Sequence, residues 1–161
     1  MADRFSYHVP LPFAMTLSWD RSRQVQRISC HRLLAQNCTD TFEKIQKAGL
    51  QSKITSFGGC FSFRPQRTGT KLSTHAWGIA IDLNPESNAQ GSAGNMDAGV
   101  VAIFKQAGFS WGGDWQGRVR DPMHFFSFVR GIERRLRFFW RALASFGSHM
   151  LACSRCSPDP S

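Results

Sequence analysis

The segment 79–83 alternates between apolar side chains and small or polar ones with a period of two. The apolar positions are Ile79, Ile81 and Leu83, and the other face carries Gly78, Ala80 and Asp82. This alternation predicts a half-buried β-strand. Two residues on the second face have almost no side chain, so the strand leaves open space beside the Asp82 carboxylate.

Two segments have the spacing of amphipathic helices. In 39–49, Phe42 and Ile45 form an apolar stripe, Asp40 and Glu43 have the spacing of a capping box, and Gly49 suits the position after the last turn. The second predicted helix begins at an Asn95 cap and ends at Gly108. Its apolar stripe consists of Val100, Val101, Phe104 and Ala107.

Short apolar runs between these helices predict further strands. Segment 9–15 contains two prolines and is expected to be extended. Segments 53–57 and 60–63 are predicted strands joined around Gly58 and Gly59, followed by a polar loop over 64–74. Segments 109–111 and 123–128 are predicted strands separated by a loop over 112–122. Because the order shows no regular βαβ alternation, we expect a small single α+β domain, with an antiparallel sheet flanked by helices.

The pattern changes after residue 128. Arginines at 130, 134, 137 and 141 form one helical stripe, and Ile132, Leu136, Phe139 and Leu143 form an apolar stripe on the opposite side. We therefore predict a domain over 1–129 and a basic tail over 130–161 that contains an amphipathic helix. Residues 130–147 are expected to contact an anionic membrane surface. The alternative is that the apolar stripe docks on the domain itself.

The charge balance narrows the set of partners. The chain has 161 residues and a formal net charge of +9, which favours nucleic acid, an anionic membrane or an acidic cell wall. No apolar run is long enough to span a membrane, and the first twenty residues do not have the pattern of a signal peptide. We expect synthesis in the cytoplasm and release to the site of action by another route. Neither a recognition helix nor aromatic RNA-binding strands are evident, so no nucleic-acid partner is expected.

Five cysteines do not make a complete disulfide framework. Cys153 and Cys156 form a lone C-x-x-C without a second pair, which does not make a zinc ribbon. Cys30 and Cys60 could pair in an oxidising compartment.

His75, Asp82 and His124 are the candidate metal ligands. Two imidazoles and one carboxylate are a common ligand set for catalytic zinc, with a fourth position left for water. Asp121 lies three residues before His124 and could act as a general base toward that water. By spacing alone, a histidine in a Phe-rich strand could equally be a core residue.

The strings LSTHAWGIAIDLNP, GFSWGGDW and DPMHF are similar to motifs of a zinc peptidase family. The family includes D-alanyl-D-alanine carboxypeptidases, vancomycin-resistance D,D-dipeptidases and bacteriophage L-alanyl-D-glutamate endolysins. Its pattern S-x-H-x-x-G-x-A-x-D is matched at every place by Ser73, His75, Gly78, Ala80 and Asp82. The resemblance implies one zinc ion held by His75, Asp82 and His124.

The resemblance also implies roles around the metal. Asp121 would be the general base, and Arg64 would hold a substrate carboxylate or a polarised carbonyl. Ser73 would either contact substrate or cap its loop, and Asp114 could support a zinc-binding histidine. This chain departs from many relatives at Phe126, where they have a glutamate on the same face as the last histidine.

Together these features predict a zinc-dependent peptidase that cleaves the stem peptide of bacterial peptidoglycan. A monomeric, phage-type endolysin acting on the L-alanyl-D-glutamate bond is favoured. The alternatives are a D-alanyl-D-alanine carboxypeptidase and a non-catalytic module of the same fold that binds cell wall or nucleic acid.

Overall fold

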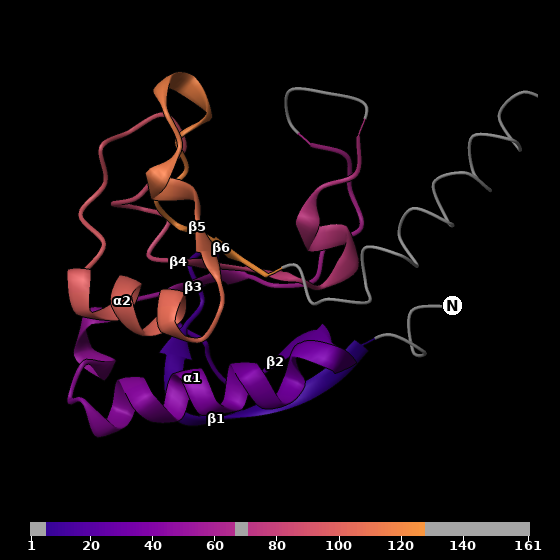
Figure 1. Cartoon of the computed structure of the whole chain (residues 1–161). Helices are drawn as coiled ribbons and strands as arrows, with labels where there is room; N and C mark the ends of the chain where they lie inside the picture. Colours follow the sequence, from indigo (N-terminus) through magenta and orange to yellow (C-terminus); the bar gives the residue numbers. More distant parts are fainter. Residues whose placement is uncertain (1–5, 67–70, 128–161) are drawn as a thin grey trace, which may run out of the picture. The chain divides into compact units, whose positions relative to one another are not determined.

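Two antiparallel sheets and two α-helices form the part of the chain that the structure, a computed structural model, describes: residues 6–66 and 71–127 (Figure 1). These residues belong to one compact unit, 1–127. The strands are β1 (Ser6–Thr16), β2 (Gln24–His31), β3 (Phe57–Gly59), β4 (Ala80–Leu83), β5 (Ser110–Trp111) and β6 (His124–Phe126), and the helices are α1 (Ala35–Lys47) and α2 (Ala98–Gln106). This arrangement confirms the predicted α+β class.

Strands β1 and β2 form a hairpin that packs on α1 (Figure 1). Val9, Met15 and Ile28 are almost fully buried and supply its apolar face. The register shifts between Pro10 and Met15, where a proline cannot donate to the ladder. The extended segment 9–15 was predicted, but β2 was not.

The second sheet carries the candidate ligands, and its strand order is β3-β4-β6-β5. The predicted strand and its apolar face are confirmed, because Ile79, Ile81 and Leu83 are at most 1% exposed, but the strand is not half-buried, since Ala80 on the other face is also fully buried. In the next strand, Phe125 stacks on Phe104 of α2 with ring centroids 4.3 Å apart. Helix α2 therefore supports the sheet that holds the ligands.

Helix α1 begins at Ala35, so the predicted capping box at Asp40 and Glu43 is wrong. A 3-10 turn over Arg32–Leu34 leads into the helix, and the His31 side chain caps that turn. Asp40 instead accepts a hydrogen bond from Gln36 at 2.7 Å. The predicted end is confirmed, since Gly49 has a left-handed φ of 70°.

Helix α2 also begins later than predicted, with Asp97 rather than Asn95 as its cap. The Asp97 side chain accepts from the N–H groups of Gly99 and Val100. Asn95 is held by Asn88, which accepts its N–H at 2.9 Å. The predicted glycine end at Gly108 is confirmed by a φ of 84°.

The strands predicted over 53–57 and 60–63 are largely wrong. The chain forms a 3-10 turn over Gln51–Lys53, and β3 begins only at Phe57 and includes both glycines. Residues 60–63 are not in a strand, and Ser62 N–H donates to the His75 carbonyl at 3.0 Å. Phe61 and Phe63 are 42% and 75% exposed.

No helix among the described residues is long and apolar enough to cross a bilayer. Cys30, Cys38 and Cys60 are buried free thiols, so the suggested Cys30–Cys60 bridge is not formed. The predicted domain boundary at 129/130, the helix with its membrane contact over 130–147, and Cys153 and Cys156 lie outside the described residues.

Candidate metal centre

His75, Asp82 and His124 meet at one point, with one potential ligand atom from each lying within 4.8 Å of the others. His75 lies in a 3-10 turn over Thr74–Trp77, immediately before β4. Asp82 in β4 and His124 in β6 are directly opposite each other in the antiparallel ladder. The sheet register therefore brings together residues that are far apart in the sequence.

The contacts within this cluster are short. Asp82 Oδ2 lies 3.1 Å from His75 Nε2, and Asp82 Oδ1 lies 2.9 Å from His124 Nδ1. The same two ring nitrogens, His75 Nε2 and His124 Nδ1, are 3.2 Å apart. Each residue thus directs a nitrogen or a carboxylate oxygen at the others.

The backbone fixes the orientation of His75. Its Nδ1 lies 2.7 Å from the carbonyl oxygen of Cys60, which can only accept, so Nδ1 carries the proton and Nε2 is left as the ligand atom. Ser73 caps the turn by accepting the His75 N–H at 3.3 Å. Gly78 ends the turn with a φ of 64°, and a Cβ there would meet the His31 backbone nitrogen at 3.0 Å.

His124 is held from the other side of the site. Its Nε2 lies 3.0 Å from the Thr74 hydroxyl, so Nδ1 is the nitrogen that faces Asp82 and His75. The ring of Phe126 stacks on His124 at 5.5 Å, on the same face as predicted. The Trp115 ring lies 5.8 Å from His124.

Electrostatics keeps Asp82 ionised. Burial opposes its charge, but hydrogen bonds from His124 and His75 outweigh burial and hold the pKa of Asp82 well below its usual range. Burial likewise disfavours a charged His75, yet the hydrogen bond and negative charge of Asp82 raise the pKa of that imidazole overall. The ionised Asp82 carboxylate thus stabilises positive charge at this cluster.

Two observations support the fit of His75, Asp82 and His124 to a zinc ion. Two imidazole nitrogens and one carboxylate oxygen are the donors that zinc prefers in catalytic sites. The neighbouring strand also leaves room for the carboxylate, since a Cβ at Gly58 would lie 2.9 Å from Asp82 Cβ and 3.2 Å from Pro85 Cγ. The predicted ligand set is therefore brought together as a metal site requires.

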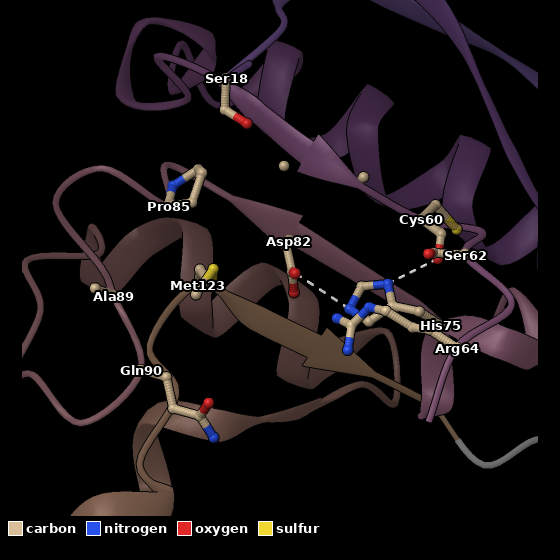
Figure 2. Close-up of a pocket in the computed structure, with 12 residues that line it drawn as sticks. Ser18, Cys60, Ser62, Arg64, His75, Asp82, Pro85, Ala89, Gln90 and Met123 are labelled. Carbon is tan, nitrogen blue, oxygen red and sulfur yellow. Dashed lines mark hydrogen bonds and ion pairs between the residues drawn. The ribbon is translucent and has the colours of Figure 1, made fainter. Parts of the chain in front are cut away.

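An open pocket of about 540 Å³ reaches this cluster, and His75 and Asp82 are part of its wall (Figure 2). Ser62 and Arg64 lie at the end nearest His75, and Met123 lies beyond Asp82. The Arg64 side chain lies beside His75 in Figure 2, and its positive charge opposes protonation of that ring. Arg64 is thus located where a substrate anion could reach it.

Residues 66–126 match the family model described as D-alanyl-D-alanine carboxypeptidase. This match confirms the resemblance seen in the sequence motifs. No curated protein and no solved structure gives a significant match. The matched segment and the His75, Asp82 and His124 cluster together support a metallopeptidase.

The matched segment contains the three candidate ligands and Asp121, whereas Arg64 precedes it. Asp121 lies in the turn before β6: its N–H donates to the Gly112 carbonyl at 2.9 Å, and its carbonyl accepts the His124 N–H at 3.0 Å. Its carboxylate oxygen Oδ1 is buried. These contacts tie the backbone of the candidate base to the backbone of one candidate ligand.

Two other predicted residues have different surroundings. Ser73 is buried and caps the His75 turn, which is the structural alternative for this residue. Asp114 forms an exposed ion pair with Lys105 at 2.7 Å. Its predicted contact with a candidate ligand histidine is not found in the described part of the chain, where Cys60 and Thr74 contact the outer nitrogens instead.

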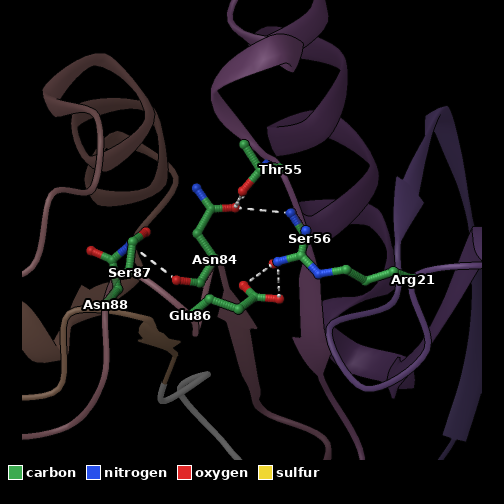
Figure 3. A network of polar contacts seen from close by, with 7 residues as sticks. All are labelled: Arg21, Thr55, Ser56, Asn84, Glu86, Ser87 and Asn88. Carbon is green, nitrogen blue, oxygen red and sulfur yellow. Dashed lines mark hydrogen bonds and ion pairs between the residues drawn. The ribbon is translucent and has the colours of Figure 1, made fainter.

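Asn84, which the sequence analysis missed, anchors the end of β4 (Figure 3). It has a left-handed φ of 51°, and its Oδ1 accepts from Thr55 N at 2.7 Å and Ser56 N at 3.1 Å. Its Nδ2 donates to the Lys53 carbonyl at 2.7 Å. Since Asp82 is two residues earlier, this network fixes the strand end that carries a candidate ligand. The Asn-Pro pair after the strand was the available signal, because Asn tolerates this conformation.

Asn88 links the same loop to β6. It is fully buried, donates to the Asn84 carbonyl at 3.1 Å and to Asn95 Oδ1 at 3.1 Å, and accepts the Met123 N–H on its own carbonyl at 3.2 Å. Met123 immediately precedes His124. The two asparagines therefore connect the segments on which Asp82 and His124 lie.

Proposed function

We propose that this chain is a zinc-dependent peptidase that cleaves the stem peptide of bacterial peptidoglycan. The observation that carries the proposal is the meeting of His75 Nε2, Asp82 and His124 Nδ1 in one cluster, two of whose members, His75 and Asp82, line an open pocket. A binding module would not need an ionised carboxylate between two oriented imidazoles beside a substrate-sized pocket.

Zinc bound to these three residues would act as a Lewis acid and lower the pKa of a water molecule in the fourth position. The chain's own residues would then handle the proton and the substrate. The Asp121 carboxylate would accept the proton from the water and pass it to the leaving amine. Its two backbone hydrogen bonds, to Gly112 and from His124, support this role because they limit its movement relative to a ligand.

Arg64 would bind the carboxylate of the substrate or its scissile carbonyl. A guanidinium is always charged and offers several donors in one plane, which suits both groups. Its position in the pocket wall beside His75 supports this role. Peptidoglycan stem peptides present such a carboxylate next to the bonds that these enzymes cut.

We favour a phage-type endolysin, and with it the L-alanyl-D-glutamate bond, on the strength of the compact size and the basic charge balance. A D-alanyl-D-alanine carboxypeptidase is the second candidate, and the description of the matching family favours it. Both reactions would use the same metal and the same base, so the choice depends on the walls of the pocket.

The test is incubation of the purified, zinc-loaded chain with defined muropeptides, followed by mass spectrometry. Loss of the terminal D-alanine indicates a carboxypeptidase, and release of L-alanine-terminated fragments indicates an endopeptidase. A chelator should abolish either product, and added zinc should restore it. A zinc-loaded chain that yields no cleavage of any stem peptide would overturn the proposal.

Asp121→Asn tests the proposed role of Asp121 as the general base. The substitution preserves the size of the side chain and removes its ability to take a proton. We expect zinc content to stay unchanged and turnover to fall by about 10²–10⁴-fold, the usual contribution of general acid–base catalysis. Near-normal turnover in this variant would assign the base to another group.

A further inference from the structure

We propose that Thr74 is a positioning residue that orients His124 for metal binding, an inference that rests on the proposed zinc function. The Thr74 hydroxyl lies 3.0 Å from His124 Nε2, on the opposite side of the imidazole from Asp82. Thr74 occupies the unspecified place of the S-x-H pattern, so the motif itself assigns it no role.

The location of Thr74 is fixed by the same turn that holds His75. The turn starts at Thr74, Ser73 caps it, and the Thr74 carbonyl accepts the N–H of Gly78. One short 3-10 turn therefore provides one candidate ligand, His75, and a hydroxyl for the other histidine. A shift of this turn would move both histidines together.

The two histidines have different partners on their outer nitrogens. His75 Nδ1 meets the Cys60 carbonyl, which can only accept a hydrogen bond. His124 Nε2 meets a hydroxyl, which can accept from an N–H or donate to a bare nitrogen. With Nδ1 as the ligand atom, Nε2 carries the proton, and Thr74 Oγ1 is the acceptor that holds the ring in this tautomer.

In the described part of the chain, the aromatic rings and the carboxylate that also contact His124 do not provide this acceptor. Phe126 and Trp115 contact the ring through their aromatic faces or edges and offer no acceptor. Asp82 contacts Nδ1, the nitrogen directed at the metal position. A residue outside the ligand set thus provides the polar contact that a carboxylate partner often gives to a metal-binding histidine.

The experiment measures the zinc affinity of the full-length chain by competition with a chelating dye. Thr74→Val retains the branched shape but removes the hydroxyl, and we expect it to weaken zinc binding by about 10–100-fold, the usual effect of losing such a partner. Thr74→Ser retains the hydroxyl and should bind like the wild type. Thr39→Val is the matched control, because it also removes a hydroxyl from a half-buried threonine, in α1 and away from the site.

Nitrogen-15 NMR of the histidine rings gives a second readout. In the zinc-loaded wild type, His124 Nε2 should carry a proton that exchanges slowly with water. In Thr74→Val that proton should exchange faster, or the ring should populate the other tautomer. Wild-type zinc affinity with an unchanged His124 signal in Thr74→Val would overturn the inference and leave the proposed function intact. A wild type that binds no zinc would overturn both.

Discussion

Asn84→Ala tests whether the network at the end of β4 holds the ligand strand. The substitution removes the Oδ1 acceptor of the Thr55 and Ser56 N–H groups and the Nδ2 donor to the Lys53 carbonyl. It also places alanine in a left-handed conformation, with φ at 51°. Both effects destabilise the folded state.

The size of the effect follows from burial. Ser56 is 2% exposed, so its N–H would lose its partner without gaining water, at a cost of about 1–3 kcal/mol. Thr55 is exposed, and water can replace the amide there. The left-handed conformation adds roughly 1 kcal/mol, because alanine tolerates it less well than asparagine. The sum is a loss of about 2–4 kcal/mol in the free energy of unfolding.

Urea unfolding of the zinc-free chain, followed by circular dichroism, measures this loss as a shift of the unfolding midpoint with an unchanged dependence of the free energy on urea concentration. Asn84→Gly separates the two effects: glycine accepts the backbone conformation but lacks the amide, so it should cost about 1 kcal/mol less than alanine. Gln36→Ala, exposed on α1, should change stability by under about 0.5 kcal/mol. An Asn84→Ala chain as stable as the wild type would refute the reasoning. Equal losses of stability in the alanine and glycine variants would refute only the contribution assigned to the left-handed backbone conformation.

Three further predictions concern the metal, pH and the tail. His75→Ala and His124→Ala should each lose bound zinc in metal analysis, and full zinc occupancy in both would exclude the proposed ligand set. In the zinc-free chain, burial lowers the pKa of His75, but the hydrogen bond and charge of Asp82 raise it overall. The stability that the His75–Asp82 pair contributes is therefore complete below about pH 6.5, the pKa of an unfolded histidine. It is lost as the pH rises through the pKa of His75 in the folded state. The melting temperature of zinc-free wild type should therefore fall more between about pH 6 and pH 8 than that of His75→Gln, and parallel curves would contradict this. Replacing arginines within 130–147 by glutamine should weaken binding of the full chain to anionic vesicles while zinc affinity stays unchanged, and unaltered vesicle binding would exclude the membrane role.

The local sequence pattern was sufficient to predict part of the fold. The alternation in β4 depends only on which side chains face the core, and the helix ends at Gly49 and Gly108 depend on the freedom of glycine to adopt positive φ. Residue type and spacing suggested the candidate ligands, and the resemblance to the zinc peptidase motifs decided for them over a core role. These features need no knowledge of distant contacts.

The start of α2 and the contacts that support the ligands depend on residues distant in the sequence and were missed. Asn95 looked like a cap, but its side-chain Oδ1 accepts a hydrogen bond from the buried Asn88 amide, and Asp97 caps the helix instead. The contact of Thr74 with His124 joins residues 50 positions apart. A sequence pattern cannot reveal such a pair until the sheet register is known.

The register of β4 against β6 has a consequence for how the protein matures. Asp82 faces His124 across the ladder, and a slip of one residue would turn His124 to the other side of the sheet and leave Met123 or Phe125 opposite the carboxylate. A slipped chain would also turn the fully buried Phe125 toward the face of the ligands, and it could not assemble the ligand set. Zinc uptake would therefore discriminate between correctly and incorrectly paired molecules, and metal loading would serve as a checkpoint that only the properly folded sheet can pass.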